Sequence, residues 1–85
     1  MRVVMYTIDR PCPLCEEAWA LLGELRKGRD FQLEKVVIDP DPRLVVRHAL
    51  RVPVVEIAGR EVAYGRVERA SLEAALLRGM GPGCA

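Results

Sequence analysis

The feature that most constrains this chain is a pair of cysteines, Cys12 and Cys15, placed between a strand-like run and an amphipathic stretch. The run before them, Val3 to Ile8, is apolar enough for a strand, and the residues after them repeat apolar positions at helical spacing. Residues three apart in a helix have Cβ atoms about 5 to 6 Å apart, a range that overlaps the Cα–Cα separations which a disulfide can bridge without backbone movement. The two sulfurs are therefore predicted to join and separate reversibly.

Pro13 favours a helix that begins at this point. Proline pushes the residue before it out of the helical region, and it suits the first helical position because its missing N–H is not needed there. Cys12 is then predicted to be the N-cap, with its sulfur facing the N–H groups of Leu14 and Cys15. These groups and the helix dipole favour a thiolate, and thiols in such positions have pKa values of roughly 3.5 to 7.5. Arg10 adds a positive charge nearby, which we expect to be secondary because solvent screens it.

The order of strand and helix patterns predicts an α/β domain. In chain order we expect a strand at 3–8, a helix at 13–27, a strand at 31–38, a helix at 42–50, strands at 52–57 and 61–64, and a helix at 68–78. The first strand, helix and strand form a βαβ unit with a right-handed crossover. The last two strands form an antiparallel hairpin around the turn at 58–60. Residues 1–79 are predicted to form the domain, and residues 80–85 a flexible tail.

Particular residues are predicted to begin or end these helices, and others to form their buried faces. Asp41 caps the second helix ahead of Pro42, Gly28 ends the first helix, and Gly79 ends the third. The predicted inner faces are Leu14, Ala18, Leu21 and Leu25 on the first helix, Leu44, His48 and Leu50 on the second, and Leu72, Ala75 and Leu76 on the third.

Composition excludes several classes of function. The net charge of the 85 residues is +1, with 13 basic and 12 acidic residues interspersed, so neither a nucleic-acid partner nor a membrane partner is indicated. No apolar run is long enough to span a membrane, and the N-terminus lacks the pattern of a signal peptide. We therefore expect a monomer in the cytoplasm. In that reducing compartment, Cys-X-X-Cys beside a βαβ unit indicates redox chemistry rather than a structural disulfide.

The element order βαβαββα and three motifs resemble the glutaredoxin-like branch of the thioredoxin superfamily over nearly the whole chain. The motifs are Cys12-Pro13-Leu14-Cys15 after the first strand, Val52-Pro53-Val54-Val55 at the third strand, and Gly65 after the fourth. The resemblance implies the minimal thioredoxin fold, a four-stranded mixed sheet flanked by three helices. It also implies that Pro53 is cis and faces the dithiol, and that Val52 offers its backbone N–H and C=O to a peptide or to glutathione. Such strand addition binds many substrates with little sequence preference.

The chain departs from the family pattern where glutathione binds. Leu14 stands where glutaredoxins commonly have tyrosine, and Arg51 stands where they usually have threonine. In the segment 65–69, which corresponds to Gly-Gly-X-Asp-Asp, Gly65 matches and Glu68 is a longer acid in place of aspartate. Three arginines are candidates to pair with the carboxylates of glutathione, namely Arg10, Arg51 and Arg66. The substrate-binding set that follows is Arg10, Pro13, Leu14, Arg51, Val52, Pro53, Gly65 and Glu68.

The function predicted from these features is that of a thiol–disulfide oxidoreductase. Cys12 attacks a disulfide and Cys15 resolves the mixed disulfide. The expected partners are disulfide-containing proteins, with glutathione or a thioredoxin-type reductase as electron donor, and no bound cofactor or metal beyond the redox-active disulfide. Two alternatives remain open, a carrier of metal or of an iron–sulfur cluster and a redox adaptor without turnover. Zinc is disfavoured because only His48 and Cys84 could complete four ligands.

The remaining aromatic, histidine and cysteine residues have simpler interpretations. His48 is predicted to be a partly buried structural residue on a helix that lies away from the dithiol. Trp19, one turn after the second cysteine, either lines the site or packs on its helix. Cys84 is predicted to be an incidental thiol of the tail, and Tyr6 and Tyr64 to fill the core or its rim.

Overall fold

A four-stranded sheet forms the centre of the molecule. The computed structural model describes residues 2–80. Its elements are β1 (Arg2–Thr7), α1 (Pro13–Arg26), β2 (Gln32–Val37), α2 (Pro42–His48), β3 (Val54–Ile57), β4 (Arg60–Tyr64) and α3 (Arg69–Met80). The strands lie in the order β2-β1-β3-β4, with β1 parallel to β2 and antiparallel to β3, and β3 antiparallel to β4. The predicted mixed sheet with three helices in the order βαβαββα is confirmed.

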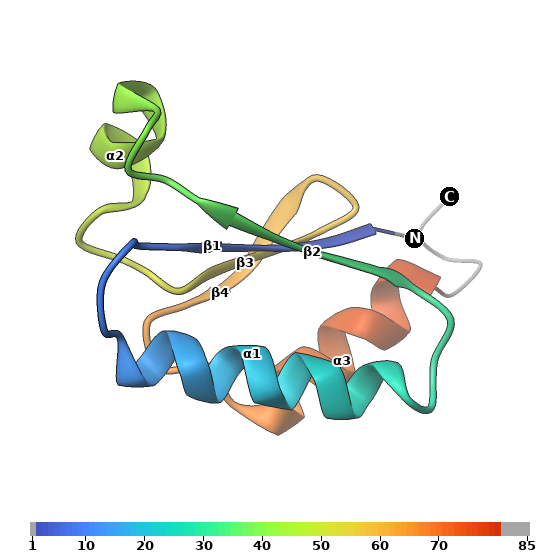
Figure 1. The fold of residues 1–85 in the computed structure, drawn as a ribbon. Helices are drawn as coiled ribbons and strands as arrows, with labels where there is room; N and C mark the ends of the chain where they lie inside the picture. Colours follow the sequence, from blue (N-terminus) through green and yellow to red (C-terminus); the bar gives the residue numbers. More distant parts are fainter. Residues whose placement is uncertain (1, 81–85) are drawn as a thin grey trace.

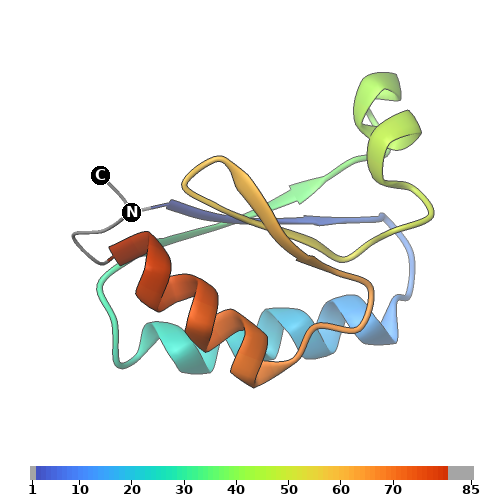
Figure 2. The ribbon, with the colours of Figure 1, turned by 180° about the vertical axis from the view of Figure 1, so that it is seen from behind.

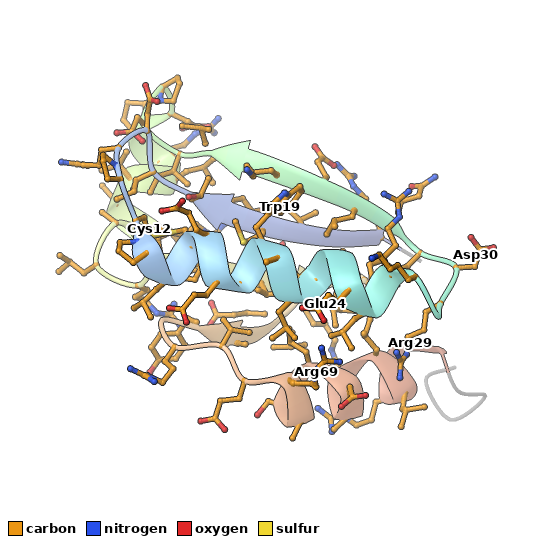
Figure 3. The ribbon with its side chains drawn as sticks, turned by 60° about the horizontal axis from the view of Figure 1, so that its bottom comes forward. Cys12, Trp19, Glu24, Arg29, Asp30 and Arg69 are labelled. Carbon is orange, nitrogen blue, oxygen red and sulfur yellow. A yellow bond between two sulfur atoms is a disulfide. The ribbon has the colours of Figure 1, made fainter. Side chains whose placement is uncertain are left out.

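The helices divide between the two sides of the sheet. Figures 1 and 2 show α1 and α3 together on one face, and α2 on the other side, near the end at which β1 finishes. An ion pair between Arg69 Nη2 and Glu24 Oε1, at 3.0 Å, joins α3 to α1 (Figure 3). Alternate residues of β1, namely Val3, Met5 and Thr7, are buried. The core therefore lies between the sheet and the α1–α3 pair.

The buried face of α1 differs from the predicted one. Cys15, Ala18, Leu22 and Leu25 are buried, whereas Leu14 is 36% exposed. The difference arises from where the helix starts, because a cap at Cys12 turns Cys15 toward the sheet. With 3.6 residues per turn, the row of buried residues that begins at Cys15 then passes through position 22. The prediction for α3 is confirmed, since Leu72, Ala75 and Leu76 are all buried.

The second helix is shorter than predicted. Its start is confirmed, because the Asp41 side chain accepts a hydrogen bond from the Arg43 N–H at 2.9 Å. It ends at His48, and the Arg51 N–H then donates to the His48 carbonyl at 2.8 Å in a turn that leads toward β3. Leu50 lies beyond the helix end and is fully exposed, so its predicted place on the inner face was wrong. His48 itself is buried.

The hairpin between β3 and β4 has a two-residue loop. Ala58 and Gly59 both have positive φ, 53° and 83°, the combination that matches the twist of antiparallel strands. The third strand begins at Val54, two residues after the predicted start, because Pro53 has no N–H to donate to a strand ladder. At the other end of the chain, α3 continues one residue past Gly79, and the predicted tail from residue 81 onward lies outside the described residues.

Candidate functional site

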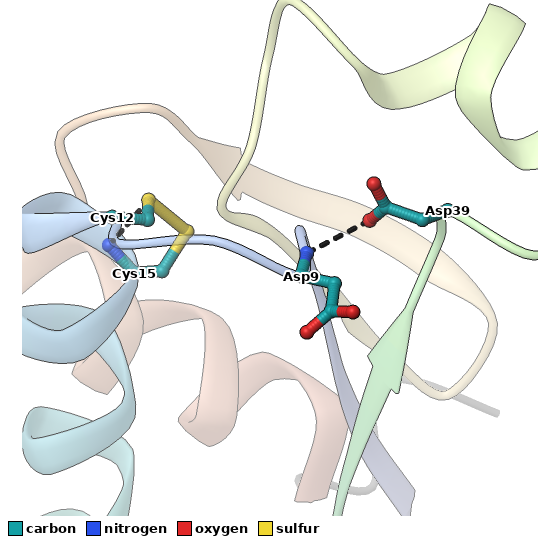
Figure 4. The surroundings of a disulfide bond; sticks show 4 residues. All are labelled: Asp9, Cys12, Cys15 and Asp39. Atoms are coloured by element: carbon teal, nitrogen blue, oxygen red, sulfur yellow. Dashed lines mark hydrogen bonds between the residues drawn. A yellow bond between two sulfur atoms is a disulfide. The ribbon is translucent and has the colours of Figure 1, made fainter.

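The two cysteines lie at the first turn of α1 and form a disulfide, with Cα atoms 5.2 Å apart. Cys12 is the N-cap, with extended backbone angles, as Pro13 predicted. The Cys12 Sγ accepts a hydrogen bond from the Cys15 N–H at 3.2 Å (Figure 4). Within the described chain this cap bond comes from Cys15 and not from Leu14, the other predicted donor. The local geometry therefore places a backbone N–H dipole at one sulfur of the disulfide.

The two sulfurs differ in their access to solvent. Cys15 is 4% exposed and belongs to the hydrophobic core, whereas Cys12 is half-buried at the edge of that core. Cys12 is therefore the more accessible of the two residues from solvent. The division between an attacking and a resolving cysteine stays a prediction, for which this difference in exposure is an argument.

The loop that carries Cys12 is fixed to the loop after β2. The Asp9 N–H donates a hydrogen bond to Asp39 Oδ1 at 2.8 Å (Figure 4). Arg10 Nη2 lies 3.9 Å from Asp39 Oδ2, with the Arg10 side chain 67% exposed. Asp39 thus holds the backbone of this loop and draws Arg10 toward β2, where Arg10 remains available to solvent.

The segment before β3 lies against the same core as the dithiol. Pro53 is buried and follows a cis bond, as the family resemblance implied, and Val52 packs against the core cluster as Cys12 does. The Gly65 N–H donates to the carbonyl oxygens of Arg51 at 3.0 Å and Pro53 at 2.9 Å. Gly65 has a φ of 66°, which glycine adopts without strain. These contacts tie the cis-proline segment to the end of β4.

Arg51 lies against β4, whereas the residues after Gly65 lie beside the first turn of α1. The Arg51 guanidinium pairs with Glu61 on β4 and lies 4.3 Å from the ring centroid of Tyr64, so it braces the cis-proline segment against that strand. A small hollow of about 170 Å³ beside the first turn of α1 is lined by Leu14, Glu17, Arg66, Val67 and Glu68. The structure thus brings Leu14 and Glu68 together, as a joint binding role requires, and directs Arg51 toward β4.

A larger cleft opens on the other flank of α1, toward the edge strand β2. Its volume is about 710 Å³. Trp19 projects from α1 on the side of β1 and β2 (Figure 3), and the Lys35 Nζ lies 4.4 Å from its ring centroid. The Trp19 side chain lines this cleft and is also packed, partly buried, against the hydrophobic core, so it occupies both of its predicted places. The cleft is lined by Met5, Thr7, Ile8, Arg10, Pro11, Cys12, Cys15, Glu16, Trp19, Ala20, Lys35 and Val37.

Sequence reasoning missed Lys35 and Val37. The parallel pairing of β1 with β2 sets Met5 opposite Lys35 and Thr7 opposite Val37. Because paired residues of neighbouring strands point to the same face, Lys35 and Val37 face α1 together with the buried side of β1. A signal was present, since Lys35 alternates in the sequence with the apolar residues Leu33 and Val37 and so shares their face of the strand. Only the register reveals which residue of β1 it lies beside.

The opposite face of the sheet holds a buried histidine. His48 is 2% exposed and stacks on Tyr6, with ring centroids 4.6 Å apart. The Tyr6 hydroxyl donates to Glu56 Oε1 at 3.2 Å. Burial lowers the pKa of His48, and burial together with the Glu56 carboxylate raises the pKa of Tyr6. The predicted place of His48 on α2 is confirmed, and the residue is more deeply buried than the partly buried position predicted for it. Tyr64 lies at the exposed rim.

Two further findings concern metals and membranes. Among residues 2–80, no three His, Cys, Asp or Glu side chains are grouped so that they could hold a metal ion. No helix in that range is long and apolar enough to cross a membrane.

Two solved structures are similar to this chain over most of its length. No curated protein matches the chain. The X-ray structure of target protein XcR50 from X. campestris is 33% identical, covering 87% of this chain and 93% of that one, with a TM-score of 0.71. The solution structure of protein Ne2328 from Nitrosomonas europaea is 30% identical, covering 87% and 88%, with a TM-score of 0.74.

A more distant structure shows the fold alone. A mutant thioredoxin from Halobacterium salinarum is 19% identical over 94% of this chain and 74% of that one, with a TM-score of 0.68.

The family described as glutaredoxin-like domain (DUF836) matches residues 2–77. With its capped Cys-X-X-Cys pair and cis-proline segment on a mixed four-stranded sheet, the chain belongs to this glutaredoxin-like domain family.

Proposed function

We propose that this protein is a thiol–disulfide oxidoreductase that works through Cys12 and Cys15. The observation that carries the proposal is the hydrogen bond from the Cys15 N–H to the Cys12 sulfur at the start of α1. In the reduced protein the same N–H and the helix dipole stabilise negative charge on that sulfur. The burial of Cys15 supports its role as the second thiol.

The proposed reaction proceeds by two exchange steps. The Cys12 thiolate attacks one sulfur of the substrate disulfide, a bond forms between the two sulfurs, and the other substrate sulfur leaves as a thiolate that takes a proton from water. Cys15 loses its proton and attacks the Cys12 sulfur, which releases the second substrate thiol. The substrate has then gained two electrons and two protons, and Cys12 and Cys15 have become a disulfide.

The partners follow from this chemistry. The substrates are protein disulfides or glutathione mixed disulfides, and Val52 and Pro53 hold their backbone by strand addition. Two thiols of glutathione, or a flavoprotein reductase of the thioredoxin type, return two electrons to the Cys12–Cys15 disulfide. The hollow formed by Leu14, Arg66 and Glu68 is the place for a glutathione moiety attached to Cys12.

The test is a redox titration of the cysteine pair in glutathione buffers, coupled to turnover assays. Wild type, Cys12→Ser and Cys15→Ser are assayed on a protein disulfide and on a glutathione mixed disulfide. Cys12→Ser should be inactive on both, because the attacking sulfur is gone. If Cys15→Ser keeps activity on the mixed disulfide, glutathione is the donor; if it loses both activities, the dithiol route operates. A wild type that turns over neither substrate refutes the proposal.

A further inference from the structure

The cleft between α1 and β2 has features that the two-cysteine reaction does not use. Both cysteines line one end of it, while Trp19 and Lys35 lie farther along its walls. Any group that enters therefore lies beside a substrate sulfur bonded to Cys12. The cis-proline segment does not line this cleft, so a substrate backbone held at Val52 leaves the cleft free for another part of the same substrate.

The walls are largely apolar, and two cationic side chains, Lys35 and Arg10, line the cleft. Trp19 and Ala20 of α1 face Val37 of β2 across the cleft. The Lys35 ammonium rests on the Trp19 ring at 4.4 Å, and such a contact holds a flexible lysine in place. Among residues 2–80, no carboxylate lies within ion-pair distance of Lys35, whereas Arg10 already has Asp39 at 3.9 Å.

One negative charge also lines the cleft. Glu16, in the first turn of α1, contributes to the wall near Cys12. It makes no ion pair with Lys35 in the described structure. The cleft thus combines apolar walls, the exposed ammonium group of Lys35 held on the Trp19 ring, and the carboxylate of Glu16. These features favour a ligand whose methylene groups lie on Trp19 and whose carboxylate reaches Lys35.

We propose that this cleft is a second substrate subsite, which takes an acidic side chain, glutamate above all, from a residue next to the disulfide-bonded cysteine of a substrate protein. The proposal rests on the proposed oxidoreductase function, since it assigns a sequence preference to the same reaction. Backbone pairing at Val52 admits many sequences, and the ion pair at Lys35 then selects among them.

The experiment compares two synthetic peptide disulfides that differ only in having Glu or Gln on both sides of the cysteine. The measured quantity is the ratio of kcat/KM for the Glu peptide to that for the Gln peptide, because a ratio cancels effects on Cys12 itself. Wild type should prefer the Glu peptide by a factor of about 1.4 to 5, the range of a partly exposed ion pair. The preference should appear in KM and should decrease at high salt.

Three variants should each change this ratio in a stated direction. Lys35→Gln should bring the ratio to one, and Glu16→Gln should raise it, because a repelling carboxylate is removed. Trp19→Leu should lower the ratio by freeing Lys35. Lys27→Gln is the matched control, since Lys27 is the chain's only other lysine and lies at the far end of α1, and it should leave the wild-type ratio unchanged.

The outcomes separate this inference from the function on which it rests. If wild type reduces neither peptide, the proposed function itself fails. If wild type reduces both with a ratio of one, or if Lys35→Gln keeps the preference, the subsite is refuted while the oxidoreductase function stands. If Lys35→Gln slows only glutathione disulfide, the cleft serves glutathione and the peptide assignment is wrong.

Discussion

A single backbone N–H distinguishes the two cysteines. Cys12 and Cys15 share a turn of helix, yet the Cys15 N–H points at the Cys12 sulfur, and the Cys15 sulfur is buried in the core. The first environment stabilises a charge and the second disfavours one. The difference in role thus arises from position along one turn of α1.

This difference predicts the reactivity of Cys12. In a Cys15→Ser, Cys84→Ser variant, Cys12 is the only thiol, and its alkylation rate by iodoacetamide should reach half its maximum below about pH 8.5, the ordinary pKa of a cysteine. The same variant unfolded in urea is the control, and its midpoint should return to about 8.5. Equal midpoints in the two states would remove the basis of the proposed mechanism.

The buried histidine predicts a pH dependence of stability. Burial lowers the pKa of His48 in the folded state, opposed by Glu56 and Glu61 and aided by Arg47 and Arg51. The unfolded chain then binds more protons than the folded one below about pH 6.5, so the free energy of unfolding falls as the pH falls below that value. The slope is at most one proton, or about 1.4 kcal/mol per pH unit.

Urea unfolding of the oxidised protein between about pH 5 and 7.5, the range in which a histidine titrates, measures this dependence. His48 is the chain's only histidine, so His48→Phe, which keeps a ring on Tyr6, should flatten the profile. A wild type whose stability is constant over this range would contradict the lowered pKa.

At the scale of elements, the capping residues made the starts of two helices predictable from the sequence. Pro13 after Cys12 and Pro42 after Asp41 each mark a helix start, and both caps are present. The buried face of α1 could not be predicted from the spacing of apolar residues alone, because Leu21 and Leu22 both continue a row of apolar residues along the helix. The cleft was missed for a related reason, since Trp19 and Lys35 meet only through the register of β1 with β2.

The rotation of α1 predicts unequal effects at two neighbouring leucines. Leu22→Ala removes a fully buried side chain and should cost about 2 to 5 kcal/mol. Leu21→Ala, at a partly buried position, should cost less than half as much. Urea denaturation of the oxidised variants measures both. Equal costs would contradict the observed burial of Leu22, and a larger cost at Leu21 would place the buried stripe where the sequence alone suggested it.

The brace on the cis-proline segment predicts a coupled pair. Arg51 contacts Glu61 and Tyr64 through a half-exposed guanidinium, so Arg51→Ala should destabilise the protein by about 1 kcal/mol. It should also raise KM for disulfide substrates more than it lowers kcat, because the segment that holds the substrate loosens. A double-mutant cycle with Glu61→Ala should give a non-additive effect on KM, and additive effects would show that the ion pair does not position the segment.

At the scale of the whole molecule, the two sides of the sheet are unequally covered. The main core lies between the sheet and the α1–α3 pair, while α2 has one buried side chain, His48, and exposes Val46. Segments with few buried contacts open more readily than the core around them. We therefore expect α2 to be the least stable helix of the domain.

Hydrogen exchange on the oxidised protein tests this expectation. The amides of Val45 and Ala49, which bond within and at the end of α2, should exchange much faster than those of the central strand β1. The exchange of β1 should follow global unfolding. Equal protection in both elements would show that the domain opens as one cooperative unit.

The chain enters the sheet at Arg2, the start of β1, and the last described residue of α3 is Met80; both lie at the end of the domain opposite the start of α1 (Figures 1 and 2). Both points of attachment are therefore remote from the first turn of α1, which carries the two cysteines. An affinity tag, a surface tether or a fused enzyme at either terminus should thus leave the reactive face unobstructed, which suits this small domain to use as a building block in larger engineered polypeptides.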